Sequence, residues 1–150
     1  MHIGVELNLF ANDFPIEDAF SEIGIDTGRM CVREEKTFRT ICGGYFTRER
    51  ECCITYKTDD IDTIDVRDVL DNMCELLKGK TNIIKSVIEK YQLKSQICVI
   101  LNITDDPIFI FTKEFIQLAA FLNCSIAIDY YYYTDIEKTI ECNDCDMQDL

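Results

Sequence analysis

The sequence predicts an α+β protein: a mainly antiparallel sheet with helices packed on one face, of ferredoxin-like flavour. Residues 3–10 alternate apolar and polar side chains, as a strand with one buried face does. Residues 65–92 repeat apolar side chains at helical spacing. Residues 96–133 have the pattern of a strand, a turn, a helix and a second strand, and this unit supplies much of the predicted core.

The chain opens with a predicted strand, Ile3–Phe10, whose polar face carries Glu6 and Asn8. A helix follows, with Pro15 in its first turn, where the missing N–H of proline is not needed. Gly24 ends this helix, because glycine readily adopts the left-handed conformation that stops a helix. The apolar stripe of the helix consists of Ile16, Ala19, Phe20 and Ile23.

The next segment has a weaker pattern. Ile25–Arg29 is a predicted loop, and Met30–Glu34 and Phe38–Phe46 are predicted strands. Inside the second of these strands, Gly43 and Gly44 indicate a bulge, a turn or a close backbone approach.

A better strand, Glu51–Thr58, follows a solvated turn at Arg48–Arg50. The acidic residues of Asp59–Ile64 predict a linker. They are closely spaced, but they lack the glycine and the distal glutamate of a calcium loop, so a solvated helix start is the better interpretation. The four carboxylates concerned are Asp59, Asp60, Asp62 and Asp65.

Two helices come next. The first, Asp65–Lys78, ends at Lys78 and Gly79, as basic residues and glycine predict. Thr81 is the expected cap of the second, Asn82–Gln92. The break between them is short, so they form either a kinked pair or a bent single rod.

The distal unit begins with the strand Gln96–Thr104, which the turn Asp105–Pro107 ends. Thr112 caps a helix that stops at Asn123, a residue suited to the left-handed conformation. The last strand, Ser125–Tyr133, is rich in β-branched and aromatic residues.

Residues 1–133 are predicted to form a single domain, and the acidic, aperiodic residues 134–150 a flexible tail. No apolar run is long enough to span a bilayer, and the first residues lack the features of a signal peptide. We therefore expect a cytoplasmic protein whose nine cysteines are free thiols, since a reducing compartment disfavours disulfides.

The formal net charge of −13 disfavours nucleic acid as a partner, because phosphate binding needs clustered lysine and arginine. The same charge permits binding to a basic protein through long-range attraction. No membrane partner is expected.

His2 is the one histidine, so histidine-based general bases, nucleophilic dyads and multi-histidine metal sites are excluded. Cys142 and Cys145 have the spacing of half a zinc knuckle, but no second half of the usual spacing exists, and an incidental pair is the better interpretation. The run Cys42–Tyr45 lacks the following helix and lysine of a phosphate cradle. No catalytic residue, metal or cofactor is predicted, and the protein is not expected to be an enzyme.

The most unusual segment is the tyrosine run in the last strand. In a strand, Asp129, Tyr131 and Tyr133 share one face, while Ile128, Tyr130 and Tyr132 share the other. If the second face packs on helices, the first presents a carboxylate between aromatic rings. Tyrosine is favoured at protein interfaces, although these rings could equally cover the open face of the sheet.

The chain also resembles a bacterial family of unknown function, the domain-of-unknown-function family numbered 4279. The resemblance spans residues 3–133. It rests on Ile23-Gly24-Ile25 followed by Thr27, on the amphipathic helices of Asp65–Gln92, and on the distal unit with Asp106-Pro107, Leu118-Ala119 and Ile128-Asp129-Tyr130. The resemblance supplies no catalytic residues. It implies small cytoplasmic bacterial proteins, some of whose relatives are suspected immunity proteins of toxin–immunity systems.

Two hypotheses follow. The first is a non-catalytic interaction protein, most concretely an immunity protein that neutralises a basic toxin domain, with a homodimer as a further possibility. The second is a small-ligand binding or enzymatic domain that uses Asp129 or Asp106 as acid or base. The candidate partner-binding residues are Asp129, Tyr131, Tyr133, Glu6, Asn8, Asp105 and Asp106.

Overall fold

A computed structural model describes residues 1–103 and 106–132, and it confirms the α+β class. Asp105, Tyr133 and the tail predicted at 134–150 lie outside the described residues. The helices are α1 (Ile16–Ile23), α2 (Val66–Leu76), α3 (Thr81–Tyr91) and α4 (Lys113–Phe121). The strands are β1 (His2–Ala11), β2 (Arg29–Arg33), β3 (Lys36–Arg39), β4 (Tyr45–Arg48), β5 (Glu51–Lys57), β6 (Ile61–Asp62), β7 (Lys94–Ile103) and β8 (Ser125–Tyr132).

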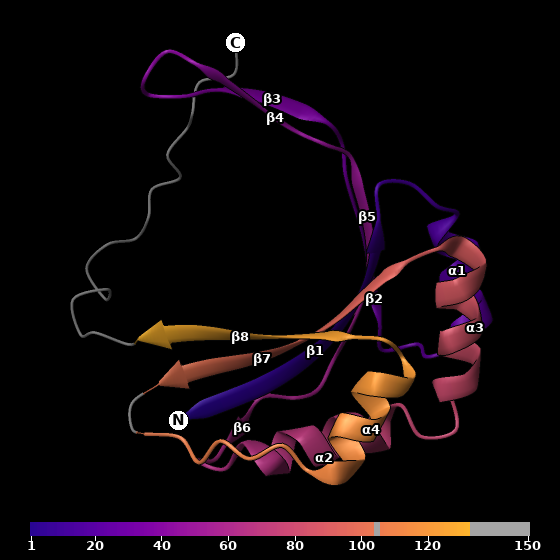
Figure 1. The fold of residues 1–150 in the computed structure, drawn as a ribbon, viewed down its shortest axis with the longest axis vertical. Coiled ribbons are helices and arrows are strands. Elements are labelled where there is room, and N and C mark those ends of the chain that lie inside the picture. The colour runs from indigo at the N-terminus through magenta and orange to yellow at the C-terminus, as the bar shows by residue number, and fades with distance from the viewer. Residues whose placement is uncertain (104–105, 133–150) are drawn as a thin grey trace.

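The main sheet has the strand order β2-β5-β1-β7-β8, and β6 pairs with β1 beside this path (Figure 1). All of its pairings in the described residues are antiparallel except that of β7 with β8, which is parallel and is connected through α4. Because β1 pairs with β7, the first and the last strand–helix–strand units meet in the middle of the sheet.

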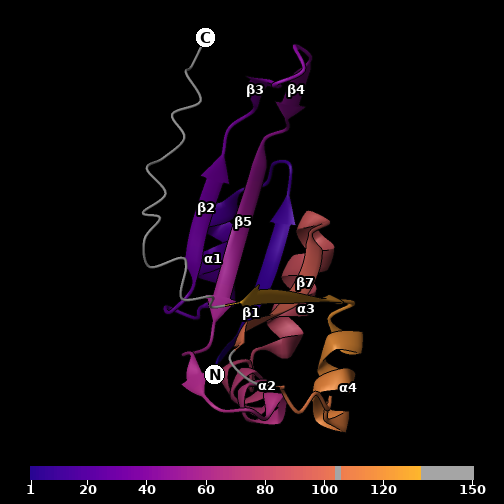
Figure 2. The same ribbon diagram turned by 90° about the vertical axis from the view of Figure 1, so that its left-hand side faces the viewer.

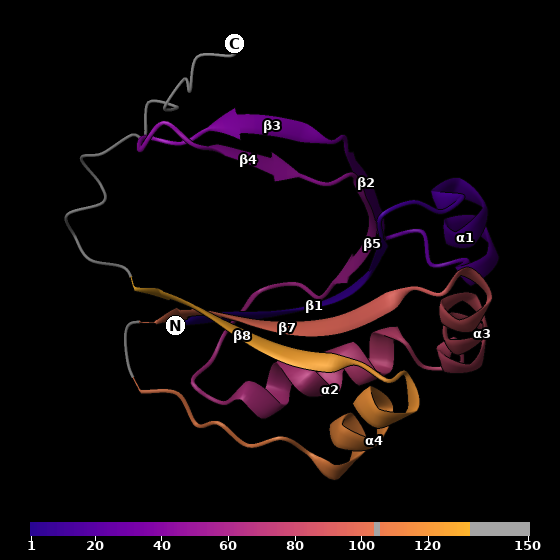
Figure 3. The same ribbon diagram turned by 45° about the horizontal axis from the view of Figure 1, so that its top comes forward.

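All four helices lie on one face of the curved sheet, on its outer side (Figure 3). The apolar residues of the central strands point to this face and are completely buried. They include Ile3, Val5, Leu7 and Leu9 of β1, Ile54 and Tyr56 of β5, and Ile97, Val99 and Leu101 of β7. The alternation in the sequence therefore identified the buried face of the sheet correctly.

Helix ends follow local chemistry. Gly24 ends α1 in the left-handed conformation at φ 69°, and Asn123 has φ 53° just after α4. Thr112 accepts a hydrogen bond from the Phe115 N–H at 3.3 Å and caps α4, as predicted. The expected cap at Thr81 is wrong, because Thr81 is the first residue of α3 and Lys80 precedes it without a side-chain cap. Helices α2 and α3 are separate and run in different directions (Figure 1), so they are not a single rod.

The prediction of one strand over Phe38–Phe46 is wrong. The segment folds back on itself as a hairpin of β3 and β4, which form a separate two-stranded sheet. Thr40 stabilises the turn, because its backbone and its side chain both bond Gly44, and Gly43 has φ 82°. Of the three roles predicted for the glycine pair, the turn is confirmed.

Two smaller expectations also change. The acidic linker Asp59–Ile64 contains β6, which pairs with His2 and Ile3 of β1. The turn predicted at Arg48–Arg50 is shorter, because Arg48 still belongs to β4 and only Glu49 and Arg50 connect it to β5. The first difference arises because β6 pairs with a strand that is distant along the chain. The second arises because Arg48 pairs with Lys36 across the turn between β3 and β4.

Candidate interaction surface

The face of the sheet that points away from the helices carries the residues predicted to bind a partner. The register places Gly4, Ile100 and Asp129 side by side across β1, β7 and β8. One level along, His2, Asn102 and Tyr131 are side by side. Residues at one level of a sheet point to the same side.

We define the open face as the residues of these three strands that point away from the helices, with Glu6, Asn8, Cys98, Asp129 and Tyr131 as its principal members. Glu6 pairs with Cys98, and Asn8 pairs with Gln96, which brings both predicted residues of β1 onto this face. The first strand is not a direct neighbour of the last, because β7 lies between them. The predicted residues of the two strands still share one face, because the register through β7 points their side chains to the same side of the sheet. These residues are Glu6, Asn8, Asp129 and Tyr131.

Asp129 is held in place by a thiol. Cys98 Sγ donates to Asp129 Oδ2 at 3.2 Å. Burial, the hydrogen bond to Asp129 and the negative charges of Asp129 and Glu6 raise the pKa of Cys98 to about 12. The thiol therefore keeps its proton at neutral pH and acts as a hydrogen-bond donor to the Asp129 side chain, which itself is exposed.

This hydrogen bond predicts a pH effect on stability. We expect Cys98 to stabilise the fold fully below about pH 8.5, the ordinary pKa of a thiol, and to lose that contribution as the pH rises toward about 12. The reason is that the unfolded chain releases the proton while the folded protein still holds it. The stability difference between wild type and Cys98→Ala should therefore shrink above about pH 8.5, by at most about 1.4 kcal/mol per pH unit.

Urea unfolding at neutral and at alkaline pH measures this difference. The other cysteines and tyrosines titrate equally in both proteins, so their effects cancel. A difference that stays constant or grows with pH would show that Cys98 does not hold its proton in the folded state.

The side chain of Asn8 is also held in place, by residues of the neighbouring strand β5. Thr55 Oγ1 donates to Asn8 Oδ1 at 2.6 Å, and Cys53 Sγ lies 3.9 Å from the same oxygen. The side-chain oxygen of Asn8 is thus engaged by β5, and its amide is held in one orientation. Pre-organised polar groups of this kind lose little entropy when a partner binds.

A third carboxylate reaches the open face from outside the three strands. Asp60 lies over Gly4, where a Cβ would clash with its carboxylate, and Asp60 pairs with Lys57 at 3.3 Å. The sequence interpretation missed Asp60, which it assigned to a solvated linker. The signal was Gly4 itself, since a glycine inside an alternating strand often marks a close approach by another part of the chain.

The remaining predicted residues are dispersed. Tyr131 is 54% exposed on the open face, and Tyr130 is 51% exposed on the opposite side of the same strand. The condition that the face of Ile128 and Tyr130 packs on helices is therefore met at Ile128, which packs against the core, and not at Tyr130. Asp106 is exposed in the segment between β7 and α4. The side chain of Tyr132 is outside the description.

A surface hollow of about 420 Å³ lies elsewhere. Its lining consists of Thr27, Lys57, Thr58, Asp59, Asn72, Glu75 and Leu76, which include neither Asp129 nor Asp106.

Among residues 1–103 and 106–132, no three histidine, cysteine or acidic side chains are grouped so that they could hold a metal ion. In the same ranges, no helix is long and apolar enough to cross a membrane.

A second surface was missed by the sequence interpretation. The arm, as we call residues 29–51, runs from the edge strand β2 through the β3–β4 hairpin to the first residue of β5, and the hairpin projects beyond the main sheet (Figure 2). The arm has six basic and four acidic residues, a net charge of 6 − 4 = +2 in a protein of net charge −13. It exposes large apolar side chains, namely Met30, Val32, Ile41, Tyr45 and Phe46. The run of basic and aromatic residues was its signal in the sequence.

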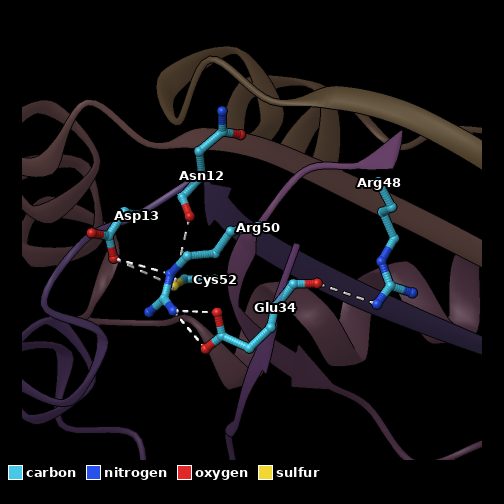
Figure 4. A network of polar contacts seen from close by, with 6 residues as sticks. All are labelled: Asn12, Asp13, Glu34, Arg48, Arg50 and Cys52. Carbon is cyan, nitrogen blue, oxygen red and sulfur yellow. Dashed lines mark hydrogen bonds and ion pairs between the residues drawn. The ribbon is translucent and has the colours of Figure 1, made fainter. Parts of the chain in front are cut away.

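The arm is attached through a polar clasp (Figure 4). The Arg50 guanidinium donates to both carboxylate oxygens of Glu34, at 2.6 and 2.7 Å, and Arg50 Nε lies 3.5 Å from Asp13 Oδ1. Arg48 also donates to the backbone oxygen of Glu34 at 3.4 Å. Asp13 lies between β1 and α1, so the clasp joins the arm to the rest of the protein. In Figures 1 and 3 the β3–β4 hairpin lies across the concave side of the sheet from β8.

The comparisons with known proteins bear on this geometry. The family model of DUF4279, a domain of unknown function, matches residues 1–133. The chain belongs to the DUF4279 family. The resemblance inferred from the residues is thus confirmed, and the DUF4279 match includes both the open face and the arm. No curated protein and no solved structure matches the chain.

Proposed function

We propose that this DUF4279 protein is a non-catalytic interaction protein, and specifically an immunity protein that neutralises a basic toxin domain. The observation that carries the proposal is the open face, where the exposed Tyr131 lies beside Asp129, whose side chain accepts a hydrogen bond from Cys98. Glu6 and Asn8 extend this face across β7. The site of action that we propose is the bacterial cytoplasm, which suits a protein with free thiols.

The charge supports a basic partner. A net charge of −13 attracts a cationic protein over a distance of about one Debye length and raises the association rate. Carboxylates at the rim of an interface contribute mainly to rate and specificity. Buried aromatic side chains contribute most of the affinity, and among the described residues of the open face Tyr131 is an exposed aromatic residue suited to this role.

The test is to purify the protein with the product of the adjacent gene and to measure binding and cell rescue. We expect a complex at low salt that weakens as salt increases, and rescue of cells that express the neighbour. Tyr131→Ala should weaken binding by about 30-fold, which corresponds to about 2 kcal/mol.

Tyr130→Ala is the matched control. Tyr130 has nearly the same exposure as Tyr131 but lies on the opposite side of β8, and we expect its removal to leave affinity nearly unchanged. Size-exclusion chromatography of the protein without a partner measures its oligomeric state. A homodimer would indicate that a second copy of the chain competes with the partner for the open face. The absence of both a complex at low salt and rescue, or equal loss in the two tyrosine variants, would contradict the proposal.

A further inference from the structure

We propose that Cys31 and Cys53 form a redox-active pair that closes a reversible disulfide across β2 and β5. The pair lies at the base of the arm. The inference does not depend on the proposed function, because it rests on the geometry of two thiols and not on the identity of a partner.

The strand register brings the two cysteines together. Cys31 and Cys53 are direct partners in the antiparallel pairing of β2 with β5. Direct partners in such a pair have Cα atoms about 4.5–5.5 Å apart, and a disulfide spans about 4.4–6.8 Å between Cα atoms. Their side chains point to the same side of the sheet. The backbone therefore already has the spacing that a disulfide requires.

The other nearby cysteines are less suitable partners. Cys52 is 1% exposed and points to the helix-covered side, where it is paired in register with Val32. Because Cys52 and Cys53 are consecutive in a strand, their thiols lie on opposite faces. Cys42 belongs to the turn between β3 and β4, away from the β2–β5 pairing.

The exposure of the two thiols indicates which of them is oxidised first. Cys31 is exposed and meets a soluble oxidant first, whereas Cys53 is half-buried. Burial raises the pKa of Cys53, although the hydrogen bond with Thr55 and the charge of Arg33 act in the opposite direction. Cys31 is therefore the thiol that is oxidised, and Cys53 is the thiol that resolves it.

The chemistry balances with a peroxide as the oxidant. The Cys31 sulfur attacks one oxygen of hydrogen peroxide, the O–O bond breaks, and Cys31 sulfenic acid and one water form. The Cys53 sulfur then attacks the Cys31 sulfur, and the hydroxyl group leaves as a second water with the Cys53 proton. A small dithiol reverses the reaction by exchange and becomes a cyclic disulfide itself.

The bond would have a structural consequence. β2 is at the end of the strand order, and β5 is its partner in the sheet. A link between Cys31 and Cys53 closes a ring that contains the β3–β4 hairpin and the clasp between Glu34 and Arg50. Oxidation thus fixes the base of the arm and slows the opening of β2 from the sheet.

The test uses the full chain. The protein is treated with hydrogen peroxide, remaining thiols are alkylated, and the protein is digested with trypsin without reduction. We expect Met30–Arg33 to be linked to Glu51–Lys57, with a mass lower by two hydrogens than the sum of the two peptides when Cys52 is counted in its alkylated form, and we expect dithiothreitol to separate them. Hydrogen exchange of the β2 amides should be slower in the oxidised protein.

Four variants identify the atoms. Cys31→Ser and Cys53→Ser should each abolish the linked pair of peptides, while Cys42→Ser and Cys52→Ala should preserve it. Loss of the link in Cys52→Ala with its retention in Cys53→Ser would overturn the assignment. The proposal also fails if peroxide yields only links between two chains, or only overoxidised Cys31 without a link.

Discussion

Phe115→Ala is expected to lower the free energy of unfolding by about 3 to 5 kcal/mol. The ring is completely buried in α4, and it stacks on Phe111 with centroids 5.4 Å apart. Phe111 in turn meets Phe109 edge-on at 5.3 Å. Truncation removes the apolar contacts and leaves a cavity that the three-ring cluster only partly fills.

Ile116→Ala is the matched control, because Ile116 is the next residue of the same helix and is 51% exposed. We expect a change within about 0.5 kcal/mol for this variant. Urea unfolding followed by circular dichroism measures both. Similar losses in the two variants would show that α4 does not pack into the core through Phe115. The result matters for the open face, because α4 connects β7 to β8 and so anchors Tyr131.

Gly28→Ala is expected to destabilise the protein by about 2 to 3 kcal/mol. A Cβ at this position would lie 2.7 Å from Phe20 Cε2 and 2.8 Å from Tyr56 Cδ1. These two rings are stacked at 6.2 Å, and Tyr56 is completely buried, so the Tyr56 ring cannot move away without displacing its neighbours. The strain arises immediately before β2, at the base of the arm.

Gly44→Ala provides the comparison. A Cβ there meets only Thr40 Oγ1, at 3.3 Å, in an exposed turn. We expect its effect to stay within about 0.5 kcal/mol. Denaturant midpoints of the two variants test the contrast. If Gly28→Ala proved as harmless as Gly44→Ala, the packing of Phe20 against Tyr56 over Gly28 would be wrong.

Local patterns predicted most elements of the fold. The alternation of Ile3, Val5, Leu7 and Leu9 identified β1 and its buried face, and Thr112 and Gly24 marked helix ends through their own side-chain or backbone chemistry. The faces of β8 followed from strand geometry alone. Tyr131 and Asp129 were therefore placed together before any tertiary contact was known.

Hairpins and pairings were harder to predict. Alternation over Phe38–Phe46 fits one strand as well as two strands with a turn, and only the bond between Thr40 and Gly44 distinguishes them. Asp60 could not be assigned to the open face, because its position depends on β6 pairing with β1. The exposure of Tyr130 depends on how far the helices extend over β8, which no local pattern encodes.

Periodicity and end signals in the chain were sufficient for the class, for most elements and for the side on which each strand residue points, because these depend on neighbours a few positions away. The strand order, the hydrogen bond from Cys98 to Asp129, the pairing of Cys31 with Cys53 and the separation of the basic arm from the acidic body come from contacts between distant segments. Such contacts form only when the whole core packs, so they became visible in the folded structure alone.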